Sequence, residues 1–227
     1  MGSTRNSVSY NPAPNILKDC IILITGAGDG IGRAVSIACA RHGATVILLG
    51  RTTTKLEAVF DEIIDSGFPE PGIVPMDLAT AGLEEISALA EVIDSRYGLL
   101  DGLLHNASIL GERVPFDHYG IDQWQQVMQV NLNAVFLLTR ILLPLLQRSD
   151  DSRLLFTSSG VGTTPRAYWG AYSVSKYATE GLAKLLADEL ANTSSVRVNI
   201  INPGATRTAM RAEAYPAEDP TTLKTPE

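Results

Sequence analysis

The chain has 227 residues, of which 45% are hydrophobic, and this size and composition suit one α/β domain with a substantial core. A formal net charge of −7 gives no general attraction to nucleic acid or to an anionic membrane, so we expect neither as a partner and favour a small-molecule substrate. Cys20 and Cys39 lie in apolar runs that are typical of buried thiols, and no metal site is predicted. The first residues do not resemble a secretory signal, so we expect a cytoplasmic location.

Residues 1–15 are polar and rich in Pro, Asn and Ser, which predicts a flexible arm in front of a single domain over 16–227. Within that domain, short apolar runs alternate with longer amphipathic segments. The runs predict six strands, at 20–25, 44–50, 72–76, 100–105, 153–158 and 196–201. The segments between them predict helices at 30–42, 53–66, 82–97, 121–148 and 171–191. This alternation indicates a doubly wound, Rossmann-type parallel sheet that is covered by helices on both faces and binds ligands at the carboxyl ends of its strands.

The loop after the first strand is rich in glycine and opens the first helix. Gly26 permits a tight turn, Gly30 a close approach to a ligand, and Gly32 close packing of helix on sheet. The helix N-terminus attracts a pyrophosphate, so we assign Gly28, Asp29 and Ile31 to the same dinucleotide site. The carboxylate of Asp29 opposes phosphate binding unless Arg33 offsets it.

The following strand ends also carry candidate residues. Arg51, after the second strand, stands where a carboxylate would select NAD, and its guanidinium favours NADP(H) over NAD(H) by pairing with a 2′-phosphate; the alternative is a solvated arginine. Asp77, beside Leu78, suits either an adenine contact or a helix cap. Asn106 and Ala107 let the backbone approach a ribose, and His105 before them reads as a packed histidine rather than a base.

Ser159 ends the fifth strand, and Tyr172 and Lys176 follow it at a spacing of four on a predicted helix. That spacing places the phenol and the ammonium on one helix face. A tyrosine normally titrates near 10, and a nearby positive charge lowers its pKa towards the range where proton transfer is feasible. Ser159 would then hold a substrate oxygen. The pattern predicts hydride transfer between a nicotinamide cofactor and a carbonyl or alcohol carbon.

Two further segments complete the candidate set. Asn131 lies in an apolar stretch, where it either orders a water that links Lys176 to solvent, or caps a helix kink or meets another helix. Pro203 and Gly204 follow the sixth strand and fix a turn beneath the cofactor, and Thr208 comes four residues after the glycine. This segment would hold the carboxamide of the cofactor.

Together these motifs resemble the short-chain dehydrogenase/reductase superfamily in its single-domain branch, over about residues 16–211, and within it the YciK-like bacterial oxidoreductases. The resemblance implies Ser159, Tyr172, Lys176 and Asn131 as a catalytic tetrad, with Lys176 also contacting the nicotinamide ribose. Ser108 departs from the glycine that is common in the family. A competing hypothesis is an NADP(H)-binding sensor or scaffold without turnover, although such proteins usually lose the Tyr/Lys pair.

The substrate pocket is expected from 109–120, 160–169 and 205–227, with five side chains giving it an apolar or aromatic surface: Tyr119, Tyr168, Trp169, Met210 and Tyr215. Surplus apolar residues on the last two long helices predict a homodimer or homotetramer. They are Phe136, Leu137, Ile141, Leu142, Leu145, Leu182, Leu185 and Leu186. The stretch 134–146 is expected to be too short to span a membrane, since Arg140 and Pro144 interrupt it.

The last residues carry a helix-start signal, in which Thr225 is the cap and Pro226 the first helical residue. The superfamily generally continues through one more helix and a seventh strand. We therefore expect that the domain is incomplete at its C-terminus, that the natural protein extends by about 20–30 residues, and that 196–201 is left as a sheet edge.

Overall fold

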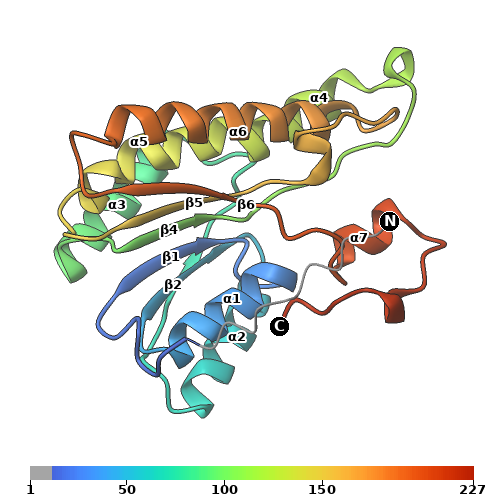
Figure 1. Cartoon of the computed structure of the whole chain (residues 1–227). Coiled ribbons are helices and arrows are strands. Elements are labelled where there is room, and N and C mark those ends of the chain that lie inside the picture. The colour runs from blue at the N-terminus through green and yellow to red at the C-terminus, as the bar shows by residue number, and fades with distance from the viewer. Residues whose placement is uncertain (1–11) are drawn as a thin grey trace, which may run out of the picture.

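The computed structural model describes residues 12–227, so 1–11 of the predicted arm lie outside the described residues. Six parallel strands form one sheet in the order β3-β2-β1-β4-β5-β6 (Figure 1). They are β1 (Ile21–Thr25), β2 (Thr45–Gly50), β3 (Gly72–Pro75), β4 (Gly102–His105), β5 (Arg153–Thr157) and β6 (Arg197–Ile201). The order reverses between β1 and β4, as in a doubly wound fold. The predicted Rossmann-type sheet of six strands is confirmed; the continuation beyond residue 227 stays a prediction.

Helices lie on both sides of this sheet. They are α1 (Gly30–Arg41), α2 (Thr53–Asp65), α3 (Leu83–Tyr97), α4 (Ile121–Met128), α5 (Ala134–Leu146), α6 (Gly170–Leu190) and α7 (Ala209–Ala214). Helices α1 and α2 lie on one side of the sheet, and α4, α5 and α6 on the other (Figure 1). Local signals set the helix ends: α3 begins where the Glu85 carboxylate accepts from the Gly82 amide at 2.6 Å, and it stops at Gly98, whose φ is +77°.

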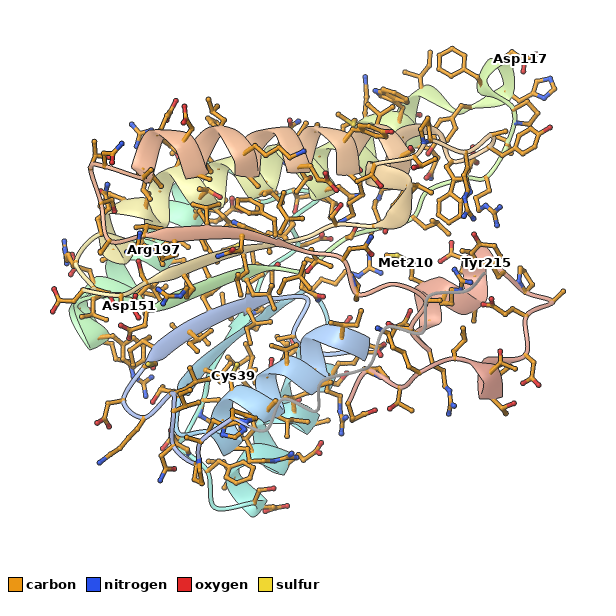
Figure 2. The ribbon with its side chains drawn as sticks, viewed as in Figure 1. Cys39, Asp117, Asp151, Arg197, Met210 and Tyr215 are labelled. Atoms are coloured by element: carbon orange, nitrogen blue, oxygen red, sulfur yellow. The ribbon has the colours of Figure 1, made fainter. Side chains whose placement is uncertain are left out.

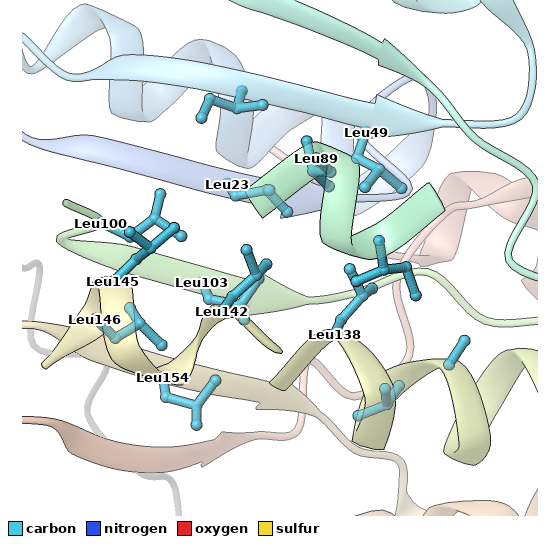
Figure 3. Close-up of a cluster of buried hydrophobic side chains, with 14 of the residues drawn as sticks. Leu23, Leu49, Leu89, Leu100, Leu103, Leu138, Leu142, Leu145, Leu146 and Leu154 are labelled. Atoms are coloured by element: carbon cyan, nitrogen blue, oxygen red, sulfur yellow. The ribbon is translucent and has the colours of Figure 1, made fainter. Parts of the chain in front are cut away.

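The larger hydrophobic cluster lies between the sheet and the layer of α3 and α5. Leucines from the strands meet leucines from these helices, as Figure 3 shows for Leu103, Leu138 and Leu142. A second cluster joins α1 and α2 to β1 and β2. The two free thiols, Cys20 and Cys39, are partly buried against this second cluster. Burial on both faces explains why the central strands are continuous apolar runs.

One face at the β6 edge is open, contrary to the prediction that helices cover both faces. Val198 and Ile200 pack against the main core, whereas Arg197, Asn199 and Ile201 alternate with them and are exposed. The reason is that α1 and α2 pack against β1, β2 and β3 and leave the far end of that side free. The apolar pattern of β6 therefore reflects one buried face rather than two.

The predicted helix over 121–148 is one continuous stretch with a π-helical turn, Gln129–Asn133, between α4 and α5. Pro144 lies inside α5 and does not end it. The stretch Ile121–Leu146 is therefore 26 residues, which by length and composition alone is enough to cross a membrane, and it is longer than the run 134–146 that the sequence analysis considered. Half of its most apolar window is buried inside the fold, and core helices meet the same criterion.

Candidate active site

The glycine-rich loop after β1 has the conformation that its residues predict. Gly26 has a φ of +68°, and a Cβ at Gly32 would lie 2.1 Å from the Gly26 carbonyl oxygen, so only glycine fits where α1 meets the loop. Asp29 caps α1, since its Oδ1 accepts from the Gly30 amide at 2.7 Å. Gly30 faces the segment after β6, because a Cβ there would lie 3.2 Å from Cγ2 of Thr208. The loop and this segment thus form two walls of one cavity.

The charge of Asp29 is offset chiefly by Lys55, and Arg33 contributes the smallest of the causes that lower its pKa. The Lys55 ammonium pairs with the Asp29 carboxylate and holds its pKa below the ordinary value. Arg33 instead pairs with Glu62 on the neighbouring helix α2. The pairing could not be predicted from the sequence, because Lys55 lies on α2 and becomes a neighbour of Asp29 only when α1 and α2 pack together.

Thr25 joins the ends of β1 and β4 at the point where the strand order reverses. Its buried hydroxyl accepts from the amides of Asn106 and Ala107, both at 3.0 Å, and the Asn106 side chain donates to the Thr25 carbonyl oxygen at 3.1 Å. Asn106 and Ala107 were predicted from the sequence as site residues, whereas Thr25 was given no role. The only signal was a hydroxyl residue at a strand end, which by itself is not specific.

Four other predicted residues lie near the strand ends in settings of their own. His105 is buried with Nε2 2.8 Å from the Thr139 hydroxyl, and burial, aided by the charge of Lys176, lowers its pKa to about 3, as suits a packed neutral histidine. Asp77 accepts from the Ala79 amide at 2.9 Å in a turn ahead of α3, whose cap is Gly82, so Asp77 is not a helix cap, and Leu78 beside it is buried. Arg51 is exposed directly after β2.

Ser159, Tyr172 and Lys176 line one cavity of about 580 Å³ at the carboxyl ends of the strands. The Lys176 ammonium donates to the Thr157 carbonyl at 2.9 Å and lies 5.6 Å from the centre of the Tyr172 ring. Burial lowers the pKa of Lys176 to about 8. It raises the pKa of Tyr172, while the Ser159 hydroxyl acts against the rise. Desolvation therefore outweighs the only cause that lowers the Tyr172 pKa, the Ser159 hydroxyl, and the lowering expected from Lys176 is not seen.

Asn131 is buried in the π-helical turn, and its side chain meets both the loop after β4 and helix α6. Its Oδ1 accepts from the Ile109 amide at 2.9 Å, and its Nδ2 donates to the Ile109 carbonyl at 3.0 Å and to the Ser175 hydroxyl at 3.1 Å. The structure thus shows the contact with another helix. An ordered water at Asn131 stays a prediction.

The outer wall of the cavity comes from α7 and from the loops before α6. Trp169, Met210 and Tyr215 line it as predicted, together with Pro203, Gly204 and Thr208. Figure 2 places Met210 and Tyr215 beside the carboxyl ends of the strands, with Arg197 at the opposite end. The prediction failed for Tyr119, which packs against Trp124 at 6.1 Å between ring centres, and for the exposed Tyr168. Arg166 and Arg211, which the sequence analysis did not select, also line the cavity.

Comparison with known proteins decides the family. A family model described as short chain dehydrogenase matches residues 20–219. The chain belongs to the short-chain dehydrogenase family. It is 52% identical over 217 residues to the oxidoreductase YciK of Escherichia coli strain K12, covering 96% of this chain and 85% of that protein.

Two solved structures show the same fold in proteins of similar sequence. One is a short-chain dehydrogenase from Shigella flexneri 2a strain 301 complexed with NADP, with 52% identity, a TM-score of 0.91, and coverage of 94% of this chain and 89% of that one. The other is from Escherichia coli CFT073 complexed with NADPH, with 52% identity, a TM-score of 0.91, and coverage of 95% and 89%. The predicted resemblance to the superfamily, and to its YciK-like members, is confirmed.

The cavity of this short-chain dehydrogenase suits the dinucleotide that the family implies. It runs from Gly30 and Ile31 at the N-terminus of α1 to Tyr172 and Lys176. Ser108 lines it with a buried hydroxyl that has no hydrogen-bond partner among the described residues. A polar ligand that reaches Ser108 would satisfy this atom, and the α1 amides would receive a phosphate.

Proposed function

We propose that this short-chain dehydrogenase transfers a hydride between NADP(H) and the carbonyl or alcohol carbon of a small molecule, with Tyr172 as the general acid and base. The observation that carries the proposal is one cavity lined by the N-terminal end of α1 at one end and by Ser159, Tyr172 and Lys176 at the other. NADP(H) supplies or accepts the hydride when it is bound.

Each catalytic side chain has a distinct task in this proposal. Tyr172 keeps its proton at neutral pH, because burial raises its pKa, and in carbonyl reduction it donates that proton to the substrate oxygen. Ser159 hydrogen-bonds the same oxygen. Lys176 holds positive charge beside the Tyr172 ring, which favours the phenolate left after donation. Asn131 fixes the turn that faces α6 and, as a further part of the proposal, orders a water that returns the proton.

NADP(H) is the cofactor that we infer, in preference to NAD(H). Arg51 directly follows β2, where a 2′-phosphate would lie, and the two similar structures are complexes with NADP and NADPH. The remaining contacts are assigned to the phosphate loop, to Asp77 and Leu78 at the adenine, to Asn106 and Ala107 at the ribose, and to Pro203, Gly204 and Thr208 at the carboxamide. Lys176 contacts the nicotinamide ribose in the same assignment.

The decisive test is Tyr172→Phe, which keeps the ring and removes the proton. We expect kcat to fall by ~100-fold or more across a panel of aldehydes, ketones and quinones, with NADPH affinity nearly unchanged. The matched control is Tyr177→Phe on the same helix, where the hydroxyl is exposed and donates to the Thr163 carbonyl. If Tyr172→Phe retains more than about a tenth of the wild-type kcat, the assignment of the general acid is wrong.

The competing function, a sensor or scaffold, makes a different prediction for the wild-type protein. It requires NADPH binding with no oxidation of the reduced ring by any member of the panel. Calorimetry and the absorbance of NADPH, measured on the same preparation, separate the two functions.

A further inference from the structure

Three arginines gather around Tyr215 at the outer wall of the cavity. The guanidinium carbon lies 3.8 Å from the Tyr215 ring centre for Arg211 and 5.2 Å for Arg113. Arg166 donates from Nη1 to the Tyr215 hydroxyl at 3.2 Å. The three residues come from three separate segments: the loop after β4, the loop before α6, and α7. Tertiary packing therefore concentrates positive charge at one place, although the chain as a whole is acidic.

This arginine cluster (Arg113, Arg166, Arg211) has fewer carboxylates than it needs for neutrality. Arg211 forms two hydrogen bonds of 2.6 Å with Glu218. Within residues 12–227 no carboxylate pairs with the other two: Arg113 donates to the Ala214 carbonyl and lies over Trp169, and Arg166 donates to the tyrosine hydroxyl. Like charges held close together repel, so an anion at this place would be favoured.

The cluster is separated from the proposed proton donor by one aromatic side chain. The centre of the Trp169 ring lies 5.8 Å from that of Tyr172 and 5.9 Å from that of Tyr215. Leu110, Val161 and Met210 add apolar wall in the same region of the cavity. A substrate that spans the cavity therefore meets a proton donor at one end, an apolar surface in the middle, and guanidinium groups at the other end.

We propose that the substrate is an oxo acid or the corresponding hydroxy acid, whose carboxylate binds Arg166 and Arg211 while its carbonyl carbon lies at Tyr172. The proposal rests on the proposed function and names its substrate class. A planar guanidinium matches a carboxylate through paired N–H donors, and both arginines line the cavity. The apolar spacer between carbonyl and carboxylate passes the Trp169 ring. A purely structural cluster that only fastens α7 would not distinguish a charged substrate from its neutral ester.

The test compares 4-carboxybenzaldehyde with methyl 4-formylbenzoate, using NADPH. We expect the wild-type kcat/KM to favour the carboxylate by about tenfold or more, since a hydrogen bond to a charged group contributes at least that factor. Arg166→Met should remove most of this preference, and Arg166→Lys should retain part of it. Arg197→Met is the matched control, because it removes an exposed arginine at the opposite end of the sheet, and it should keep the wild-type ratio.

A second measurement does not depend on turnover. 4-Carboxybenzyl alcohol and its methyl ester are titrated by calorimetry into the protein loaded with NADPH, where no hydride can be accepted. Tighter binding of the carboxylate, lost in Arg166→Met and weakened by salt, supports the proposal. Equal binding, or equal kcat/KM for the two aldehydes, overturns it. If the aldehydes are reduced equally, the proposed hydride transfer stands and only the substrate class fails; if neither is reduced, the binding preference alone decides the substrate class.

Discussion

Lys176 carries a buried ammonium group, and the free energy that its burial costs the folded chain depends on pH. Its pKa is about 8 in the folded chain against an ordinary value of 10.5. Between these two values the unfolded chain holds one more proton at this site, so the contribution of Lys176 to the free energy of unfolding rises with pH. Below pH 8 the folded protein must bury the charge, which is unfavourable apart from the hydrogen bond to the Thr157 carbonyl.

Replacing Lys176 by methionine should therefore stabilise the chain most at low pH. We expect Lys176→Met to raise the free energy of unfolding by up to about 3 kcal/mol at pH 7, and the gain to shrink towards zero as pH approaches 10.5. Urea titrations of the wild type and of Lys176→Met at pH 7, 8, 9 and 10 measure the difference in their free energies of unfolding. The titration of all other groups is common to both proteins and cancels. A gain that is constant over this range would contradict the lowered pKa.

Arg51 tests cofactor choice at a single side chain. In the wild type we expect NADPH to bind more tightly than NADH, and Arg51→Ala to raise the NADPH Kd by about tenfold, or about 1.4 kcal/mol, with little change for NADH. The loss is moderate because Arg51 is exposed and its charge is screened. Arg41→Ala, which removes another exposed arginine at the end of α1, is the control. Equal wild-type affinities for the two cofactors, measured by calorimetry, would refute the role.

The roles of single residues could be predicted where they depend on residues nearby in the sequence. Tyr172 and Lys176 share a helix face, and Gly32 must be glycine where α1 meets its loop; both follow from neighbours in the sequence. The pairing of Lys55 with Asp29 and the gathering of arginines at Tyr215 did not follow. These contacts join segments that are far apart in the chain, and no sequence spacing encodes them.

At the scale of elements, the π-helical turn Gln129–Asn133 positions Asn131. Asn131→Ala would leave the Ile109 amide and carbonyl without their side-chain partner in a largely buried setting. We expect the free energy of unfolding to fall by roughly 2–4 kcal/mol. Asn133→Ala in the same turn removes only an exposed hydrogen bond to Gln129 and should change stability little. Equal losses in the two variants, measured by urea titration, would show that the Ile109 contact is not what matters.

The six strands and the five long helices could be predicted because their apolar patterns are long and regular. The π-helical turn could not, since one extra residue hardly disturbs the apolar pattern on either side of it. Helix α7 was also missed, because six residues are too few to show a period. The open face beside β6 was mistaken for a covered one, although Arg197 and Asn199 alternate with the partly buried Val198 and Ile200, a pattern that indicates one solvent-facing side.

At the scale of the molecule, the homodimer or homotetramer stays a prediction. The apolar surface available for contact between copies is smaller than the sequence indicated. Leu142 and Leu145 are buried in the core and cannot contribute to an interface. Phe136 on α5 and Leu185 on α6 are each 54% exposed, in the same helical layer (Figure 1). Exposed apolar side chains of this size favour contact with a second copy.

We expect a homodimer or homotetramer, and a shift towards monomer when Phe136 and Leu185 are both replaced by glutamate, since burying two unpaired charges opposes association. Light scattering at micromolar concentration gives the mass. Leu83→Glu on α3, which is 63% exposed in the wild type, serves as the control and should keep the wild-type mass. A monomeric wild type would rule the interface out.

The π-helical turn also makes this segment sensitive to chain length. Each residue of an α-helix turns the chain by about 100°. Deleting one residue from 129–133 would restore ordinary helical spacing and rotate α4 against α5 by that angle, carrying the buried Val127 away from the core. A substitution at Asn133, the exposed position of this turn, should be well tolerated, whereas single-residue insertions and deletions should not. The number of residues here is thus constrained together with the identity of the buried Val130 and Asn131.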